Sequence, residues 1–149
     1  MSSPFLINAG AEDWLHPAWR EQFYPVGLPD DWLLAYYNTR FQAVYLSAAR
    51  WQAASAAEWA QWLNETQPGF RFLLEPGAAV PPRDARVIEA TSGWRAMHLW
   101  WIDDCPDLRA LARRAADQAA AGEALYVISR QGNLALLEQV NTLRQVLGY

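Results

Sequence analysis

The 149-residue chain contains no lysine, a single cysteine and only two histidines. One cysteine excludes a disulfide bond within the chain. A dedicated zinc site draws its ligands mainly from cysteine and histidine, which are too few here, so we expect no metal centre. No apolar run approaches the roughly 20 residues that a membrane-spanning helix needs, so we expect no transmembrane segment.

Export signals and excess positive charge are missing as well. Residues 1–5 read Met-Ser-Ser-Pro-Phe, without a basic side chain and without a long apolar run after them, so the sequence predicts no secretory signal. Together with the scarcity of cysteine, this favours a reducing cytoplasm. The arginine-only basic residues and the abundance of alanine favour a GC-rich bacterial genome. The net charge of −4 gives no general attraction for phosphate backbones, so we expect neither nucleic acid nor a membrane as partner.

What the chain has in quantity is apolar and aromatic side chains. Hydrophobic residues make up 52% and charged residues 19%, which excludes a disordered tail or a polar linker. The length is that of about one domain, and no repeat or linker divides it, so we take residues 1–149 as a single domain. Nine tryptophans are far more than usual. Such large rings fill cores or line binding sites.

Strands and helices alternate along the sequence. Apolar runs predict strands over residues 5–8, 43–46, 70–74, 97–102 and 124–128, with a weaker candidate over residues 86–90. Helical patterns are found over residues 29–38, 55–65, 105–121 and 134–147. This alternation predicts an α/β fold with a mainly parallel sheet and flanking helices. Residues 13–27 and 76–86 are expected to be connections.

The start of the second helix carries the most specific local signal. Ser55 and Glu58 have the spacing of a capping box, in which each side chain accepts a hydrogen bond from the other residue's backbone N–H. Trp59 and Trp62 share the apolar side of this helix, so we expect both to be structural residues packed on the sheet. Asp104 is expected to cap the third helix.

A series of motifs covers the first half of the chain. Residues 8–14 read Asn-Ala-Gly-Ala-Glu-Asp-Trp, and residues 23–29 read Phe-Tyr-Pro-Val-Gly-Leu-Pro after a Trp19-Arg20 pair. Residues 41–46 and 68–72 continue the series with Phe-Gln-Ala-Val-Tyr-Leu and Pro-Gly-Phe-Arg-Phe. This series resembles the N-terminal part of the YecE-like family, also called domain of unknown function 72, which opens with a strand and Gly-Thr-Ser-Gly-Trp, then Trp-Arg and Phe-Tyr-Pro-x-Gly-Leu. The resemblance implies a (β/α) TIM-barrel fold.

Such barrels take roughly 250 residues, so the resemblance implies a shortened and degenerate member with an abbreviated sheet of about five strands. If the family's strand order is kept, the last strand lies beside the first, and the strands over residues 70–74 and 97–102 form the edges. The inner face of the sheet then needs a cover. Either residues 76–94 fold across it as a plug, or two chains form a homodimer. We favour the homodimer, because nine tryptophans are hard to bury in one small chain.

Ligands of parallel α/β folds bind at the carboxyl ends of the strands. Glu12 and Glu75 follow predicted strands and are candidates for a general acid and base, and His16 is a candidate for proton transfer at the mouth of the site. Each has a plainer alternative, because strand-end carboxylates are often solvated or cap helices and a loop histidine is often held by a hydrogen bond. The sequence alone assigns no catalytic residue.

A second set of residues is suited to binding a ligand. In this set Arg20 and Arg50 can bind phosphate, and the large rings can stack on bases or sugars. Arg130 follows the last predicted strand. The set is Trp14, Trp19, Arg20, Tyr24, Arg50, Trp51 and Arg130. Alternatively, the rings form a small core that covers the end of the barrel.

The polar positions of the family differ in this chain. Its Glu-Ile-Asn-Ser-Thr-Phe-Tyr corresponds to Tyr-Leu-Ser-Ala-Ala-Arg-Trp over residues 45–51, its strand lysine to Glu75, and its Phe-Asn-Asn to Ser-Arg-Gln over residues 129–131. We therefore predict a binding or structural protein without catalysis. The alternatives are a small enzyme acting on a phosphorylated or sugar-like molecule, and a single-stranded nucleic-acid-binding protein. No phosphate-binding loop, dinucleotide fingerprint or nucleophile elbow occurs, so we expect no cofactor.

Overall fold

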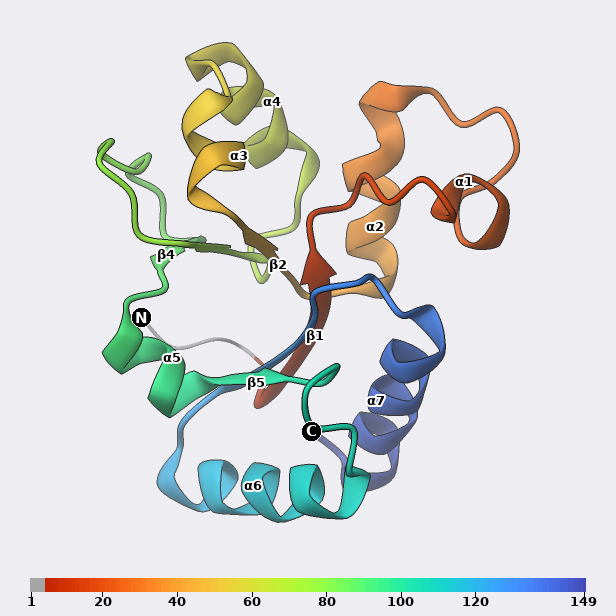
Figure 1. The fold of residues 1–149 in the computed structure, drawn as a ribbon, viewed down its shortest axis with the longest axis vertical. Helices are drawn as coiled ribbons and strands as arrows, with labels where there is room; N and C mark the ends of the chain where they lie inside the picture. The colour runs from red at the N-terminus through yellow and green to blue at the C-terminus, as the bar shows by residue number, and fades with distance from the viewer. Residues whose placement is uncertain (1–4) are drawn as a thin grey trace.

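Six parallel strands form one curved sheet in the structure, a computed structural model that describes residues 5–149. The strands are β1 (Ile7–Glu12), β2 (Ala43–Leu46), β3 (Arg71–Leu74), β4 (Val87–Glu89), β5 (Leu99–Trp101) and β6 (Leu125–Ser129), in the order β4-β3-β2-β1-β6-β5. The sheet curls into part of a barrel (Figure 1), which confirms the predicted α/β class and the abbreviated TIM-barrel-like architecture. The prediction that there is no secretory signal is based mainly on residues 1–4, which lie outside the described residues.

The helices are α1 (Trp19–Gln22), α2 (Leu33–Arg40) after a 3-10 turn at Asp30–Trp32, α3 (Ala48–Ala53), α4 (Ala56–Glu65), α5 (Ser92–His98), α6 (Leu108–Ala121) and α7 (Leu134–Leu147). The sequence analysis missed α1, α3 and α5, because a helix of at most seven residues makes too few turns to show an apolar period. Within residues 5–149, no helix has the length and apolar character that crossing a membrane requires.

Side-chain caps fix where the helices begin. The capping box is confirmed: the Glu58 amide donates to Ser55 Oγ at 3.1 Å, and the Ser55 amide donates to the Glu58 carboxylate at 3.2 Å. The predicted cap of α6 is wrong. The Asp107 carboxylate, not that of Asp104, accepts from the amides of residues 109 and 110, because the backbone of Asp104 takes part in a turn that ends on the Trp101 carbonyl.

The strand expected over residues 97–102 begins two residues later than predicted. Met97 and His98 form the last turn of α5, and β5 starts at Leu99. The apolar run therefore belongs to two elements. Its first residue, Met97, is 58% exposed, whereas a buried strand would have covered it.

The outer face of the sheet carries the larger core. Strand residues such as Val44, Phe72 and Val127 pack there against the helices that surround the sheet. Trp59 and Trp62 of α4 belong to this core and are only 6% and 7% exposed, which confirms that they are structural residues.

The edges of the sheet differ in part from the prediction. The last strand, β6, does lie beside β1, and β5 is an edge. The prediction that the strand over residues 70–74 is an edge is wrong, because β4 pairs with β3 and takes the edge position. The outer side of β4 is partly closed by its own chain, since the Val87 amide donates to the Asp84 carbonyl and the Thr91 amide to the Glu89 carbonyl. Short, self-bonded edges of this kind discourage pairing with other strands.

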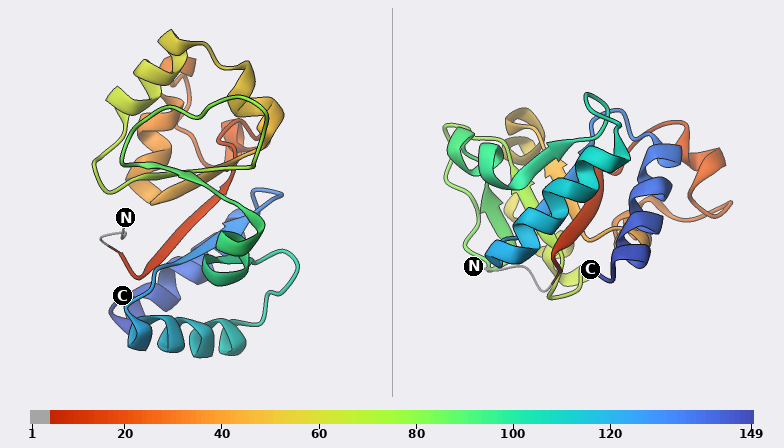
Figure 2. Two further views of the ribbon diagram at one scale, coloured as in Figure 1. Left: turned by 90° about the vertical axis from the view of Figure 1, so that its left-hand side faces the viewer. Right: turned by 90° about the horizontal axis from the view of Figure 1, so that it is seen from below.

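Helix α5 covers the inner face of the sheet. Figures 1 and 2 show it between β4 and β5, across the open side of the curve. Trp94 of α5 lies 5.3 Å from the ring of Tyr126, and Ile88 of β4 joins the same small inner core. The segment over residues 76–94 thus supplies part of the cover that the plug alternative required, although Val80 within it is 86% exposed. The homodimer stays a prediction.

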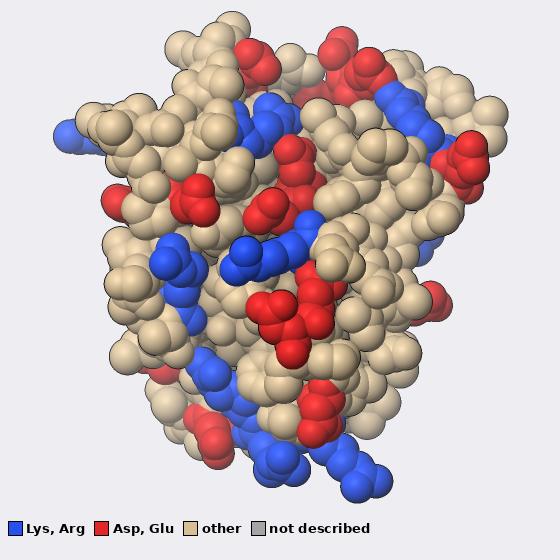
Figure 3. All heavy atoms as spheres, viewed as in Figure 1, with Lys and Arg blue, Asp and Glu red and all other residues tan. Residues whose placement is uncertain are grey.

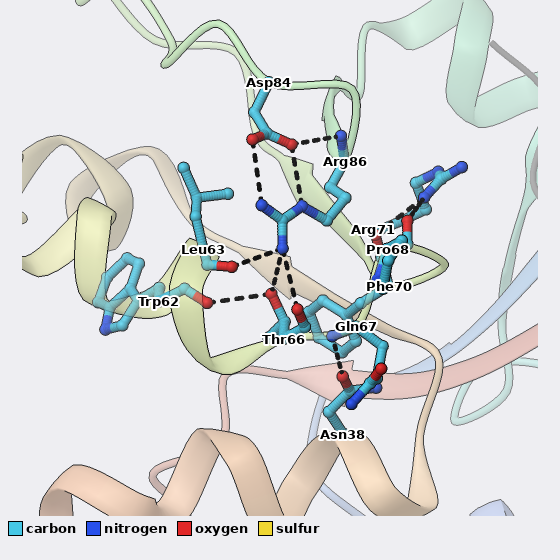
Figure 4. A network of polar contacts seen from close by, with 10 residues as sticks. All are labelled: Asn38, Trp62, Leu63, Thr66, Gln67, Pro68, Phe70, Arg71, Asp84 and Arg86. Carbon is cyan, nitrogen blue, oxygen red and sulfur yellow. Dashed lines mark hydrogen bonds and ion pairs between the residues drawn. The ribbon is translucent and has the colours of Figure 1, made fainter.

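Arg86 joins the start of β4 to the end of α4 (Figure 4). Two of its guanidinium nitrogens donate to the two carboxylate oxygens of Asp84 at 2.9 and 3.1 Å. The third nitrogen donates to the Leu63 carbonyl at 2.6 Å and to the carbonyl and hydroxyl of Thr66 at 3.0 and 3.1 Å. The Leu63 and Thr66 carbonyls belong to a helix C-terminus, where a basic side chain satisfies acceptors that have no partner within the helix. Hydrogen bonding to Arg86 in turn lowers the pKa of Asp84.

The hydroxyl of Tyr37 lies between the two central strands. It accepts from the Ala11 amide of β1 at 2.7 Å and donates to the Ala43 carbonyl of β2 at 2.6 Å. Tyr37 is fully buried, and burial holds its pKa well above the usual range, so the group stays a neutral phenol. A Cβ at Gly10 would lie 1.8 Å from that same carbonyl oxygen, so only glycine fits at this point of β1.

We expect Tyr37→Phe to destabilise the fold on the order of 2 kcal/mol or more, because it leaves one buried amide and one buried carbonyl without a partner. Tyr36→Phe is the matched control, since Tyr36 is the half-buried neighbour and its loss of a hydroxyl should change stability by about 0.5 kcal/mol or less. Urea unfolding of the two variants and the wild type provides the measurement. Equal losses in both variants would contradict the bridging role of the Tyr37 hydroxyl.

Candidate functional site

An open hollow of about 350 Å³ lies at the carboxyl ends of the strands. Its walls come from the ends of β1, β2, β3, β5 and β6 and from α5. The lining residues are Glu12, Tyr45, Glu75, Pro76, Arg95, Trp101 and Arg130. We call this place the strand-end hollow. It is where parallel α/β folds bind their ligands.

Two carboxylates form the acidic side of the strand-end hollow. Glu12 is the last residue of β1, and Glu75 follows β3 and accepts a hydrogen bond from the Ala48 amide at 2.9 Å. Burial raises the pKa of Glu12, and the charge of Glu75 raises it further, while Arg130 opposes the rise. The structure thus brings together the two carboxylates that the sequence analysis selected as an acid–base pair.

The sequence analysis missed Tyr45 and Arg95. Tyr45 is buried, which raises the pKa of its phenol, as does the Glu75 carboxylate, whereas Arg95 opposes the rise through its charge and a hydrogen bond. Arg95 is held in place by donating to the Ala90 carbonyl at 2.7 Å. Tyr45 alternates with Ala43 along β2, and this period of two could have placed its side chain on the inner face. Arg95 gave no signal, because α5 itself was not predicted.

Arg130 and Trp101 form the side of the hollow at the ends of β6 and β5, where Arg130 lies next to Glu12 because β6 pairs with β1. The Arg130 guanidinium carbon lies 3.8 Å from the centre of the Trp101 ring, a cation–π contact that leaves the guanidinium edge open to solvent. The Trp101 ring in turn packs edge-on against Tyr45 at 4.9 Å. On this face of the molecule basic and acidic side chains alternate across the centre (Figure 3). The hollow therefore offers both anion-binding and cation-binding groups.

A second hollow of similar size lies beyond the end of β1. It is lined by Trp14, Leu15, His16, Pro17, Arg20, Tyr24, Asp30, Leu33, Arg50, Glu58 and Trp62. Arg50 donates to the Asp13 carboxylate at 2.8 Å, and its guanidinium lies 5.0 Å from the rings of both Trp14 and Trp62. Arg20 forms an ion pair with Asp30 and donates to a backbone carbonyl at 2.8 Å. Both predicted phosphate-binding arginines thus have acidic partners.

The four aromatic residues of the set that was predicted to bind a ligand lie in the core. Trp14, Trp19, Tyr24 and Trp51 are each 5% exposed or less. The Trp19 indole N–H donates to the Gly132 carbonyl at 3.0 Å, and the Trp51 indole N–H donates to the Glu75 carbonyl at 2.8 Å. Trp51 therefore holds the main chain behind the strand-end hollow. A stacking role for these rings stays a prediction.

His16 lines the second hollow and contacts the backbone of Glu12. Its Nε2 is 2.6 Å from the Glu12 carbonyl, and its ring packs 4.5 Å from the ring of Trp19. A Cβ at Gly132 would lie 2.8 Å from this imidazole, so the loop after β6 closes tightly over it. His16 thus contacts the backbone of Glu12, and its role in proton transfer stays a prediction.

Comparison with known proteins supports the resemblance. The profile of a family described as "Protein of unknown function DUF72" matches residues 8–80. The chain belongs to the DUF72 family. A crystal structure of a DUF72 family protein from Thermotoga maritima aligns at 16% identity and a TM-score of 0.42, over 93% of this chain and 52% of that protein. The chain thus spans about half the length of that relative, and no curated protein matches it.

The DUF72 match divides the strand-end hollow. Glu12, Tyr45 and Glu75 lie within the matched residues 8–80, whereas Arg95, Trp101 and Arg130 lie outside them. The acidic side of the hollow therefore comes from the part of the chain that matches the DUF72 profile. Its basic side comes from the part that the profile does not match.

We expect Glu12→Gln to make the protein more stable at neutral pH. The pKa of Glu12 is raised in the folded state, so the ionised carboxylate costs stability once the pH exceeds that raised pKa. Below the ordinary pKa of glutamate both forms are neutral, and the variant should unfold like the wild type. Thermal unfolding at acid and neutral pH measures the difference. Glu138→Gln, at an exposed position on α7, is the control and should leave the pH dependence unchanged.

Proposed function

We propose that this DUF72 protein binds a small molecule in the strand-end hollow and does not transform it. The single observation that supports this proposal best is the convergence of four ionisable side chains, Glu12, Glu75, Arg95 and Arg130, on one open hollow. They come from segments far apart in the sequence. Such convergence of polar groups at the carboxyl end of a parallel sheet is typical of a ligand site.

The chemistry of the lining favours a ligand with two kinds of polar group. Arg95 and Arg130 suit a phosphate or a carboxylate, because guanidinium groups donate paired hydrogen bonds to such oxygens. Glu12 and Glu75 suit hydroxyl or amino groups, which donate hydrogen bonds to a carboxylate. A phosphorylated or sugar-like molecule combines both, and its size is compatible with a hollow of about 350 Å³.

The residue types at the hollow favour binding over catalysis. Among residues 5–149, no serine, cysteine, threonine or histidine lines the hollow. Its one tyrosine is buried with a raised pKa, and so it is a poor nucleophile at neutral pH. The remaining groups are suited to recognition by charge and hydrogen bonds.

Titration calorimetry with glucose 6-phosphate, glucose and inorganic phosphate tests the proposal. We expect saturable binding of the phosphorylated sugar, with weaker binding of the two fragments. Arg130→Gln should weaken it roughly tenfold or more, which is the loss of one charge-assisted hydrogen bond. Arg113→Gln, at an exposed position on α6, removes the same charge without touching the hollow and should have no effect. Absence of saturable binding, or equal effects of both variants, would contradict the proposal.

Acid–base catalysis at the same place is the second candidate, and the raised pKa of Glu12 is the observation that favours it. A carboxyl group with a raised pKa keeps its proton to a higher pH than an ordinary glutamate and can donate that proton to a leaving group. If the protein is an enzyme, the phosphorylated sugar is consumed on incubation, and Glu12→Gln abolishes turnover while binding persists. Stable substrate over long incubation supports binding alone.

A further inference from the structure

A carboxylate outside the strand-end hollow organises the loop that follows β6. Asp103 lies two residues after the end of β5. One of its oxygens accepts from the Ser129 hydroxyl at 2.7 Å. The other accepts from the Arg130 amide and, at 3.3 Å, from the Gln131 amide. Three successive residues at the end of β6 are thus bonded to one side chain.

The same contacts extend to the last helix. The Ser129 hydroxyl, which donates to Asp103, accepts from the Asn133 amide at 2.9 Å. Asn133 caps α7 by accepting from the Leu136 amide at 3.1 Å. Ser129 itself is fully buried. The path of the chain from β6 to α7 is therefore fixed by a short series of hydrogen bonds that begins at Asp103.

Arg130 is the residue that this arrangement holds at the edge of the hollow. Its side chain is exposed and contacts the Trp101 ring, and a free arginine there would sample many rotamers. Ordering such a side chain on ligand binding costs about 0.5–1.5 kcal/mol. A main chain already fixed at Arg130, together with the Trp101 ring below the guanidinium, lowers that cost before any ligand arrives.

We infer that Asp103 is a positioning residue of the strand-end hollow: by bonding the backbone after β6, it holds Arg130 over Trp101, beside Glu12 and ready for the anionic group of the ligand. Asp103 does not line the hollow, so it acts through Arg130 and not on the ligand. The inference rests on the proposed function for its ligand. The placement of Arg130 itself can be tested without any ligand.

Glu12 reports where Arg130 lies. The positive charge of Arg130 lowers the pKa of the Glu12 carboxyl. Asp103→Asn keeps the shape of the side chain but replaces one of its acceptor oxygens with a donor, so it should release the loop and move Arg130 away. The pKa of Glu12 should then rise. If the only effect were the loss of the negative charge of Asp103, the pKa of Glu12 would fall. The sign of the change therefore separates movement of Arg130 from the loss of the charge itself.

The experiment is an NMR titration of the Glu12 carboxyl in the wild type, in Asp103→Asn and in Asp104→Asn. Asp104 is adjacent and exposed, so its change removes the same charge without the bonds to the loop. We expect a higher pKa of Glu12 in Asp103→Asn only. An unchanged or lowered pKa in that variant would overturn the inference. If Asp103→Asn does not fold, Ser129→Ala removes one of the three bonds and should raise the pKa of Glu12 by a smaller amount.

Ligand binding provides the second readout. We expect Asp103→Asn to weaken binding of glucose 6-phosphate roughly tenfold, as Arg130→Gln does, and the double variant to bind no worse than Arg130→Gln alone. Additive losses would overturn the inference, because they would show that the two residues act separately. If the wild type does not bind glucose 6-phosphate, the proposed ligand is wrong, and the titration of Glu12 still decides the role of Asp103.

Discussion

The Tyr37 hydroxyl is the contact on which the centre of the sheet depends. It stands between β1 and β2, where it completes the hydrogen bonding of the Ala11 amide and the Ala43 carbonyl. These two strands end in Glu12 and beside Tyr45, so the contact that Tyr37 makes between them lies directly behind two residues that line the strand-end hollow. The packing of one helix on the outer face is thereby linked to the geometry of the candidate site. Gly10 completes this arrangement, because any side chain there would collide with β2.

An open sheet also leaves its inner face uncovered, and one short segment covers part of it. Between β4 and β5 the chain forms α5, whose Trp94 packs on Tyr126 of the inner face. The same helix carries Arg95 into the strand-end hollow. One element thus covers the inner face of the sheet and supplies a basic group to the site. A change that loosens α5 would therefore affect stability and ligand recognition together.

The sequence predicted those parts of the molecule whose signals are local. The Ser55–Glu58 capping box, the apolar runs of the central strands and the structural role of Trp62 all depend on neighbours within a few residues, and the structure confirms them. The errors arise where tertiary contacts decide. Asp107 replaces Asp104 as the cap of α6 because a turn consumes the backbone before it.

The same distinction between local signals and tertiary contacts applies to the candidate site. A residue that follows a predicted strand within a few positions, such as Glu12, Glu75 or Arg130, can be placed at the carboxyl edge from the sequence. Arg95 comes from an unpredicted helix and could not be placed. The predicted stacking role of the aromatic residues could not be decided from the sequence either. A sequence does not show whether Trp19 and Trp51 point into a site or into the core, because that depends on how their neighbours pack.

The two hollows differ in how their arginines are paired. Because the chain has no lysine, arginine carries all of its side-chain positive charge apart from the histidines. Arg20, Arg50 and Arg86 each have an aspartate within ion-pair distance, so their charge is compensated within the fold. Within the described part of the chain, neither Arg95 nor Arg130 has such a partner; both line the strand-end hollow together with the carboxylates of Glu12 and Glu75 instead. A ligand with an anionic group and hydrogen-bond donors can satisfy both sides at once, which a hollow lined by paired charges would not allow.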